Sequence, residues 1–297
     1  MQGQDWLAVR FEENRDRLRG VAYRMLGSVS EADDAVQEAW LRLSRSDSDG
    51  IENLNAWLTT VVSRVCLDVL RSRKSRREES LETQAAPPVS HDERTDPEQE
   101  AMMADAVGLA LLVVLDRLSP AERLAFVLHD LFAIPFEEIG GIVGKSPMAA
   151  RQLASRARKR VQGATTMGRE ELDEQRDAVN RFLAALRAGD VNGLVAVLDP
   201  EFVIHIDEFS SVQPGASGQR EVRGAENWAR QAVAFTRMAR FIRPMLVDGV
   251  PGIVLAPKGR LMRVLRFRFA EGKIVEAEVI GDQETLSRME LAVLETA

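Results

Sequence analysis

Residues 119–161 read SPAERLAFVLHDLFAIPFEEIGGIVGKSPMAARQLASRARKRV, the stretch that is most informative about the fold. Ser119 suits a helix cap, Pro120 suits the first helical position, and Glu122 stands where a capping box places an acid. The apolar spacing that follows predicts a helix over 121–131.

A second pair of helices follows in the same stretch. The pattern predicts a short helix over 136–143, a turn at Gly144 and Lys145, and a longer helix from Pro147 with Ser146 as its cap. Two helices joined by a tight glycine turn are typical of a helix-turn-helix, whose second helix enters the major groove of DNA.

The helix that begins at Pro147 has two sides of different character. An apolar seam with spacings of three and four would pack on the preceding helices: Ala150, Leu153, Ala154, Ala157 and Val161. The candidate DNA contacts are the cap and the polar side: Ser146, Arg151, Gln152, Ser155, Arg156, Arg158 and Lys159. Arginine and glutamine near the helix start suit base edges, whereas the later basic residues suit phosphates. The alternative is a merely solvated basic helix. We favour DNA binding because the cap, the proline, the glycine turn and the acid-free basic face coincide.

Residues 5–77 show helical spacing throughout. The second of three predicted helices begins at the sequence Ser30-Glu31-Ala32-Asp33, and the third runs from about Leu54 to Arg73. A polar loop over 44–53 separates them. Amides, hydroxyls and arginines of the third helix are candidates for contacting unstacked bases and the backbone: Asn53, Asn55, Thr60, Ser63, Arg64, Arg71, Arg73 and Lys74. We interpret Trp57, on the same helix, as a core residue.

The second helix carries an acidic face that would repel DNA. Its members suit a basic protein surface instead: Asp33, Asp34, Gln37 and Glu38. The sequence therefore predicts one helix for a protein partner beside one helix for nucleic acid.

Residues 78–105 differ in composition from both helical segments. They hold nine acids, one arginine and three prolines, and show little apolar periodicity. This composition predicts an acidic, flexible linker between the helical segments 5–77 and 106–162.

The last segment, 174–295, has the pattern of an α+β domain. A helix is expected from Asp177 to about Leu198, and further helices over 225–239 and 284–294. Alternating segments such as 202–207 and 261–269 predict strands, and the pairs Asp-Gly, Lys-Gly and Glu-Gly predict turns in an antiparallel sheet.

The bulk composition limits the function classes. The chain has 297 residues with 45% apolar residues, enough for two or three domains with real cores. The net charge of −7 argues against indiscriminate coating of nucleic acid. Cys66 is the single cysteine, so neither a disulfide within the chain nor a cysteine zinc cluster is expected. No long apolar run or secretory leader is evident, so we expect a cytoplasmic protein without cofactor or metal.

Five segments, in two separate modules, resemble a known family. The segments RLRGVAYRMLGS at 17–28, EADDAVQEAW at 31–40 and AWLTTVVSRVCLD at 56–68 resemble region 2 of extracytoplasmic function sigma factors. The segments LSPAER at 118–123 and AARQLASRAR at 149–158 resemble region 4 of the same family. The remainder, from about Glu174, resembles a SnoaL-like domain, a cone of curved sheet and helices.

The resemblance implies roles for the matched parts. Region 2, at 5–77, would bind the clamp of core RNA polymerase through Asp33, Asp34, Gln37 and Glu38, and would open and read the −10 promoter element through the loop 46–52 and the helix from Asn53. Region 4, at 106–162, would read the −35 element through the helix from Pro147. The chain is thus expected to be an alternative sigma factor rather than an enzyme.

The C-terminal segment contains one candidate acid/base pair. His205 and Asp207 alternate onto one face of a strand, and would line a pocket if that face points into the cone. We favour a hydrogen-bonded pair at a strand end, since no nucleophile or phosphate loop accompanies the two residues. The domain is therefore expected to be regulatory, with a small ligand as a further input that the sequence does not identify. Two other hypotheses are a SnoaL-type enzyme tethered to DNA-binding helices and a helix-turn-helix regulator that needs no polymerase.

Overall fold

A computed structural model describes residues 2–46, 51–82, 108–210 and 220–294. The chain divides into two compact units. The helical unit holds residues up to Val107 and from Leu115 to Arg158, and the C-terminal unit holds Gly108–Val114 and everything from Lys159. Most of the segment expected to be a linker, together with the loop 47–50, lies outside the described residues.

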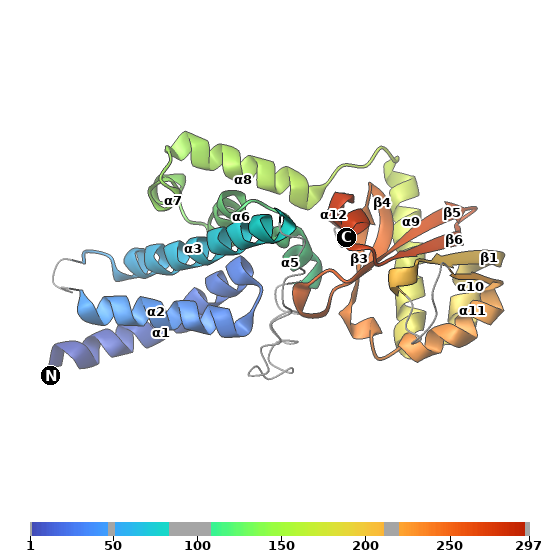
Figure 1. Ribbon diagram of the computed structural model, residues 1–297, viewed down its shortest axis with the longest axis horizontal. Coiled ribbons are helices and arrows are strands. Elements are labelled where there is room, and N and C mark those ends of the chain that lie inside the picture. The colour runs from blue at the N-terminus through green and yellow to red at the C-terminus, as the bar shows by residue number, and fades with distance from the viewer. Residues whose placement is uncertain (1, 47–50, 83–107, 211–219, 295–297) are drawn as a thin grey trace. The chain divides into compact units, whose positions relative to one another are not determined.

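The first module of the helical unit consists of three helices: α1 (Gln2–Leu26), α2 (Val29–Arg45) and α3 (Leu54–Glu82) (Figure 1). The chain turns between α1 and α2 at Gly27, whose φ is +73°. Ser28 then caps α2, because its hydroxyl accepts a hydrogen bond from the Glu31 amide at 3.4 Å. The expected start at Ser30 was wrong by two residues, since the glycine turn leaves Ser28 in the extended conformation that a cap requires.

The second module of the helical unit contains the expected helix-turn-helix. Its elements are α6 (Pro120–Phe126), a π-helical turn η2 (Val127–Leu131), α7 (Phe136–Val143) and α8 (Pro147–Gln162). The capping box at Ser119 and Glu122 is confirmed in both directions. The predicted helix 121–131 is confirmed as well, with its last turn widened from α to π.

Helix α5 (Leu109–Asp116) belongs to both units along its length. Its residues through Val114 are part of the C-terminal unit, and Leu115 and Asp116 are part of the helical unit. Helix α8 is divided in the same way between Arg158 and Lys159.

The C-terminal unit is built on a seven-stranded sheet with the strand order β2-β1-β6-β5-β4-β3-β7. The strands are β1 (Leu198–Ile206), β2 (Arg220–Arg223), β3 (Ile242–Val247), β4 (Val250–Leu255), β5 (Arg263–Ala270), β6 (Lys273–Ile280) and β7 (Leu291–Val293). The helices are α9 (Arg169–Ala188), α10 (Val191–Val197), α11 (Ala225–Ala232) and α12 (Gln283–Arg288), with short 3-10 turns η3 (Glu208–Ser210), η4 (Val233–Phe235), η5 (Ala239–Phe241) and η6 (Pro257–Gly259).

Four expectations for this unit need correction. The helix expected over 225–239 ends at Ala232, and the chain continues in the 3-10 turn η4. The sheet is mixed, because β1 runs parallel to β6. The helix expected up to Leu198 is two helices, since Gly189 takes a left-handed φ of +66° and Asp190 caps α10. The helix expected over 284–294 ends at Arg288, and the chain then forms β7 at the edge of the sheet beside β3.

The tight turns were predicted correctly. Asp248-Gly249 and Glu271-Gly272 both have positive φ at their two central residues, the conformation of the hairpin turn that matches strand twist. They connect β3 to β4 and β5 to β6.

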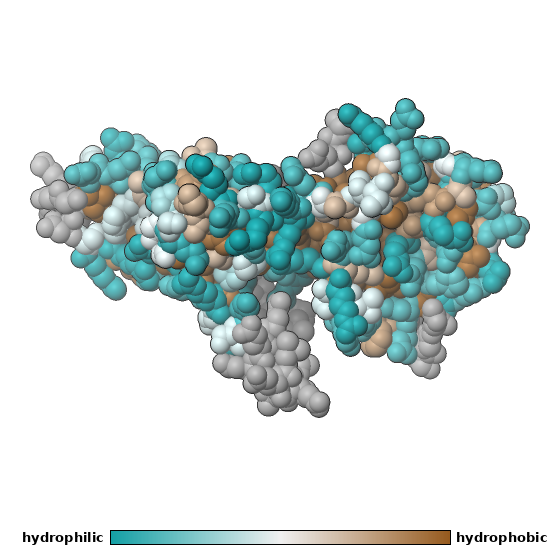
Figure 2. Space-filling view, turned by 90° about the horizontal axis from the view of Figure 1, so that it is seen from above, coloured by the Kyte–Doolittle hydropathy of each residue, from teal (hydrophilic) through white to brown (hydrophobic). Residues whose placement is uncertain are grey.

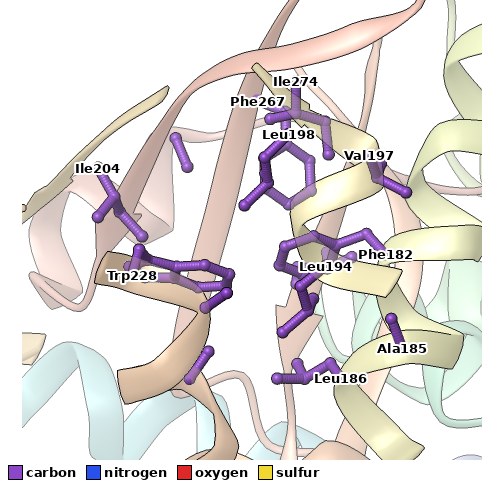
Figure 3. Close-up of a cluster of buried hydrophobic side chains, with 14 of the residues drawn as sticks. Phe182, Ala185, Leu186, Leu194, Val197, Leu198, Ile204, Trp228, Phe267 and Ile274 are labelled. Carbon is purple, nitrogen blue, oxygen red and sulfur yellow. The ribbon is translucent and has the colours of Figure 1, made fainter. Parts of the chain in front are cut away.

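Each face of the sheet has its own apolar core. Helices α9, α10 and α11 cover one face, where the rings of Phe182, Trp228 and Phe267 meet with centroids 5.4 to 5.5 Å apart (Figure 3). The other face buries Val113 and Val114 of α5 against Met245 and other strand residues, together with side chains of α12. The fold class is therefore as expected, two all-α modules followed by an α+β domain.

Candidate nucleic-acid interface

The turn between α7 and α8 is held by close backbone contacts. A Cβ atom on Gly140 would lie 2.7 Å from the carbonyl oxygen of Lys145, so this position accommodates only glycine. Gly144 ends α7 with φ +69°, and the Ser146 hydroxyl accepts a hydrogen bond from the Ala149 amide at 3.2 Å. The start of α8 is therefore fixed in position before any ligand arrives, and Ser146 serves as a helix cap, as predicted.

Helix α8 buries its seam and exposes its polar side. The residues Ala150, Leu153, Ala154 and Ala157 are buried. The exposed residues include Arg151, Gln152, Ser155 and Lys159. Figure 2, which looks onto the side of the helical unit that carries α7 and α8, shows mostly hydrophilic residues there.

The guanidinium of Arg151 lies over the aromatic ring of Phe136. Its Cζ lies 5.3 Å from the centroid of the Phe136 ring, and that ring stacks on His129 with centroids 3.9 Å apart. A cation over an aromatic face is attracted by the ring quadrupole. This column of side chains positions one of the predicted base-reading residues.

Two of the predicted DNA contacts form ion pairs with other helices of the same module. Arg156 Nε donates to Glu122 Oε1 at 3.0 Å, and Arg158 Nε donates to Asp130 Oδ1 at 2.7 Å. The hydrogen bond with Asp130 raises the pKa of the Arg158 guanidinium. These two arginines tie α8 to α6 and η2. The other exposed members of the predicted set include Arg151, Gln152, Ser155 and Lys159.

The candidates for −10 contacts on α3 differ in exposure and in the contacts that they make. Ser63 is fully buried, so its assignment as a DNA contact was wrong: the residue lies on the inner side of the helix with Val62 and Cys66. Asn53 caps α3, because its side-chain oxygen accepts from the Ala56 amide at 3.1 Å. The outward residues are Asn55, Thr60, Arg64, Arg71 and Lys74, of which Thr60 is half-buried and the others exposed.

Arg73 and Arg64 each make a contact within the helical unit. Arg73 donates to the Leu26 carbonyl at 3.0 Å and forms an ion pair with Glu31, so it ties α3 to the α1–α2 turn. Arg64 Nη2 donates to the Gly141 carbonyl of α7 at 3.3 Å. The half-buried Arg73 is thus better explained as a structural residue than as a DNA contact.

The four candidate polymerase contacts lie on the outer side of α2. Asp33 forms an ion pair with Arg19 at 2.6 Å, and Glu38 forms one with Arg42 at 2.8 Å. Asp34 and Gln37 are exposed. A hollow of about 510 Å³ lies beside them and is lined by Arg15, Asp16, Arg19, Asp33, Gln37 and Trp40.

The two modules of the helical unit meet at a buried arginine that the sequence analysis missed. Arg123 of α6 is 3% exposed, and its Nε donates to the Arg24 carbonyl at the end of α1 at 3.1 Å. Burial lowers the pKa of Arg123 to about 10 and raises the pKa of the Cys66 thiol to about 12. Arg24 in turn lies over the ring of Phe132, 5.3 Å from its centroid. The sequence gives no indication that Arg123 is buried, because a basic residue among polar helix positions is normally expected to be exposed.

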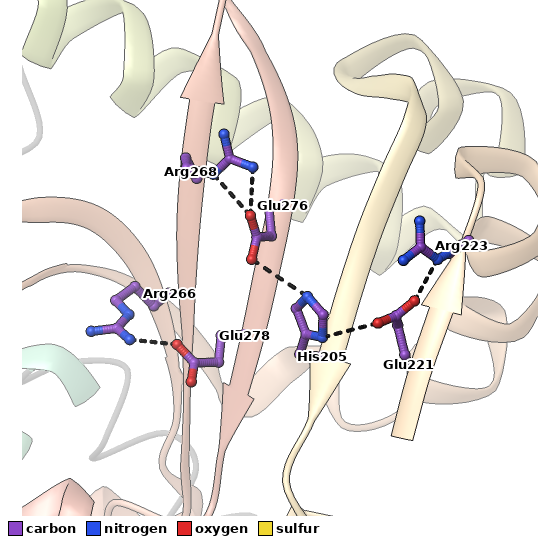
Figure 4. A network of polar contacts seen from close by, with 7 residues as sticks. All are labelled: His205, Glu221, Arg223, Arg266, Arg268, Glu276 and Glu278. Atoms are coloured by element: carbon purple, nitrogen blue, oxygen red, sulfur yellow. Dashed lines mark hydrogen bonds and ion pairs between the residues drawn. The ribbon is translucent and has the colours of Figure 1, made fainter. Parts of the chain in front are cut away.

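His205 does not lie on the sheet face that α9, α10 and α11 cover. Ile204 and Ile206 point into the core with α11, so His205 points to the opposite face, between Glu221 at 3.6 Å and Glu276 at 3.5 Å (Figure 4). Asp207 Oδ2 accepts from the amides of Gly281 and Asp282 at 2.6 and 3.0 Å. The condition for a shared pocket in the cone is therefore not met. The hydrogen-bonded pair expected from the sequence was wrong as well, because Asp207 bonds to the two amides and His205 lies between the two glutamates.

Two further properties concern the described part of the chain. No helix there is long and apolar enough to cross a membrane. Within the same ranges, no three His, Cys, Asp or Glu side chains come together as a metal site.

Comparisons with known proteins agree with this arrangement. Residues 10–76 match the Sigma-70 region 2 family, and residues 108–161 match the Sigma-70, region 4 family. The ECF RNA polymerase sigma factor SigJ of Mycobacterium tuberculosis is 44% identical over 222 residues, which cover 74% of this chain and 70% of that protein. A crystal structure of SigJ from the same organism aligns with 94% of this chain and 98% of its own, at 34% identity and a TM-score of 0.45.

A second relative spans nearly the whole molecule. The probable ECF RNA polymerase sigma factor SigI of Mycobacterium tuberculosis is 31% identical over 291 residues, which cover 96% of this chain and 97% of that protein. Both sigma regions and the α+β extension fall inside this alignment. The chain therefore belongs to the extracytoplasmic function family of RNA polymerase sigma factors.

Proposed function

We propose that the C-terminal unit regulates this sigma factor by restraining both ends of its region 4 segment. As a family member the chain binds core RNA polymerase and promoter DNA and directs transcription initiation, and its relatives are initiation factors rather than enzymes. The packing of the C-terminal unit indicates what this unit adds to the activity. The same membership supports a cytoplasmic site of action, where RNA polymerase works.

One observation carries the proposal. Val113 and Val114 are 2% and 1% exposed, and they share a core with Met245, Ile280 and Leu291 of the sheet. Val161, near the end of α8, packs against the same core. The region 4 match spans residues 108–161, so residues near both ends of that segment pack in the C-terminal core.

Because both ends of the region 4 segment are anchored, the helix-turn-helix between them has less freedom to move. A segment whose ends are held loses conformational freedom relative to one on a free linker. The apolar contacts at Val113, Val114 and Val161 set the energy needed for release, and burial of a valine contributes about 1.5 kcal/mol or more. We infer that a signal that loosens this core frees region 4 to take up the −35 element.

We also propose a division of labour among exposed residues. Arg151, Gln152 and Ser155 read −35 bases, and Lys159 contacts phosphate. Asn55, Thr60, Arg64, Arg71 and Lys74 serve the −10 element, and the outer side of α2 binds polymerase. Arg151→Ala and Gln152→Ala should each relax −35 preference by about 1–3 kcal/mol. Lys159→Ala should weaken all sequences alike and reduce the salt slope of binding by about one.

The regulatory proposal is tested with the full chain. Val113→Ala combined with Val114→Ala removes packing on α5 without cutting the protein. The matched control is Val179→Ala in α9, a fully buried valine of the other core. We expect the double variant to raise promoter-specific transcription with purified core polymerase, and the control to leave it as in the wild type. Equal or lower transcription by a folded double variant would overturn the proposal.

A further inference from the structure

Met148 is an apolar side chain without a structural role in its own module. It is 72% exposed, the highest value among the large apolar side chains of the described residues. It stands at the second position of α8, directly after Pro147. Single exposed apolar residues are common on protein surfaces, so exposure alone does not give Met148 a function, whereas its position on α8 does.

The helix geometry places Met148 beside the predicted base readers. Arg151 and Gln152 follow it by three and four residues, and residues at these spacings share one helix face. The buried seam begins at Ala150, which lies on the other side of the helix. The Ser146 cap and the Gly140 contact hold this first turn in place.

The surroundings favour nucleic acid as the partner. Residues 145–160 hold six basic side chains and no acid. Arg156 and Arg158 form ion pairs with Glu122 and Asp130, whereas Met148, Arg151 and Gln152 are exposed in the first turns of α8. Residues at the start of a recognition helix are the ones that contact base edges in the major groove.

The chemistry of the side chain selects one feature of the groove. Among the four bases, only thymine presents a methyl group there, at C5. Methionine is unbranched and adapts its shape to an apolar neighbour. We propose that Met148 is a specificity-determining residue that packs on the C5-methyl group of a thymine in the −35 element. This inference rests on the proposed reading of that element by α8.

The test compares thymine with deoxyuridine, which lacks only the methyl group. Duplexes with a randomised −35 element are first selected with wild-type holoenzyme, and each thymine of the selected element is then replaced in turn. Burial of one methyl group predicts that one such replacement lowers wild-type affinity about four-fold. Holoenzyme carrying Met148→Ala should bind the thymine and deoxyuridine duplexes equally. Met148→Leu should recover part of the difference.

The controls separate the possible results. Met262→Ala, at a methionine that is 44% exposed in the C-terminal unit, should keep the thymine preference. Three results would overturn the inference: a selected element without thymine, the same methyl effect in Met148→Ala, or an equal loss on all promoters, which would indicate a protein contact. If Arg151→Ala and Gln152→Ala also leave −35 preference unchanged, the proposed role of α8 fails too. If they change it, the failure is confined to Met148.

Discussion

Glu122 and Arg156 join the first and last helices of the helix-turn-helix, with Arg156 Nε donating to Glu122 Oε1 at 3.0 Å. The same carboxylate accepts hydrogen bonds from the Ser119 hydroxyl at 2.7 Å and the Ser119 amide at 3.3 Å. Its side chain is 8% exposed, whereas that of Arg156 is 57% exposed. Glu122 is therefore a buried acceptor that joins Ser119 and Arg156, and Arg156 is its solvent-exposed partner.

Glu122→Ala should destabilise the helical unit by about 1–3 kcal/mol, because it leaves the Ser119 groups at the helix start without their partner. Arg156→Ala should cost about 0–1 kcal/mol, since its charge is largely solvated. Chemical unfolding of the two variants measures the difference. Promoter binding measured alongside should change little for Arg156→Ala. A larger loss there than for Arg151→Ala would show that Arg156 contacts DNA after all.

Cys66 should give the helical unit a pH-dependent stability. Burial raises the pKa of its thiol from 9.0 to about 12. Between these values the unfolded chain ionises and the folded chain does not, so stability should fall by up to about 1.4 kcal/mol per pH unit. The lowered pKa of Arg123, about 10, acts in the opposite direction above pH 10, because the folded state then loses a proton that the unfolded state keeps.

The window from pH 9 to pH 10 therefore isolates the thiol. Unfolding free energies of the wild type and Cys66→Ala should converge as the pH rises through this window. Parallel profiles would mean that the thiol is not protected by burial in this way.

Gly163→Ala should disturb the junction between α8 and the C-terminal core. Gly163 has φ +66°, and an added Cβ would overlap the side chain of Ala292 in β7. We expect a loss of about 1–3 kcal/mol in the unfolding free energy, from backbone strain together with the clash. Gly168→Ala is the control, because Gly168 has φ −63° and open space at its Cβ. It should cost about 0.5 kcal/mol as a helix-cap change.

His205→Ala should leave transcription unchanged. The imidazole lies on the sheet face away from α11, in a network that includes Glu221, Glu276 and Arg268 (Figure 4). Contacts of this kind between partly exposed groups contribute about 0–1 kcal/mol to stability. Promoter-specific transcription and thermal unfolding check both expectations. A variant that folds normally but fails in transcription would revive a functional role for this residue.

The parts of the fold that depend on near neighbours in the sequence could be predicted. The capping box at Ser119 and the turns at Gly249 and Gly272 follow from local conformational preferences, and each was predicted from its residues. Contacts between segments that are far apart in the sequence could not be predicted from local conformational preferences. The parallel contact of β1 with β6 and the burial of α5 depend on surfaces far along the chain. Ser63 was assigned to DNA because a hydroxyl on a polar helix looks exposed until its neighbours are known.

The packing of α5 also has a consequence for biosynthesis. About 180 residues separate Val114 from β7, which completes the core that buries it. At about 5–20 residues per second, the ribosome needs roughly 10–35 s to make that length. From the completion of α8 at Gln162 until β7 is made, the nascent chain contains the whole helix-turn-helix, while the last strand of the core that buries Val113 and Val114 is still missing. If the C-terminal unit restrains region 4 as proposed, each molecule passes once, during its synthesis, through a form in which region 4 is not yet restrained.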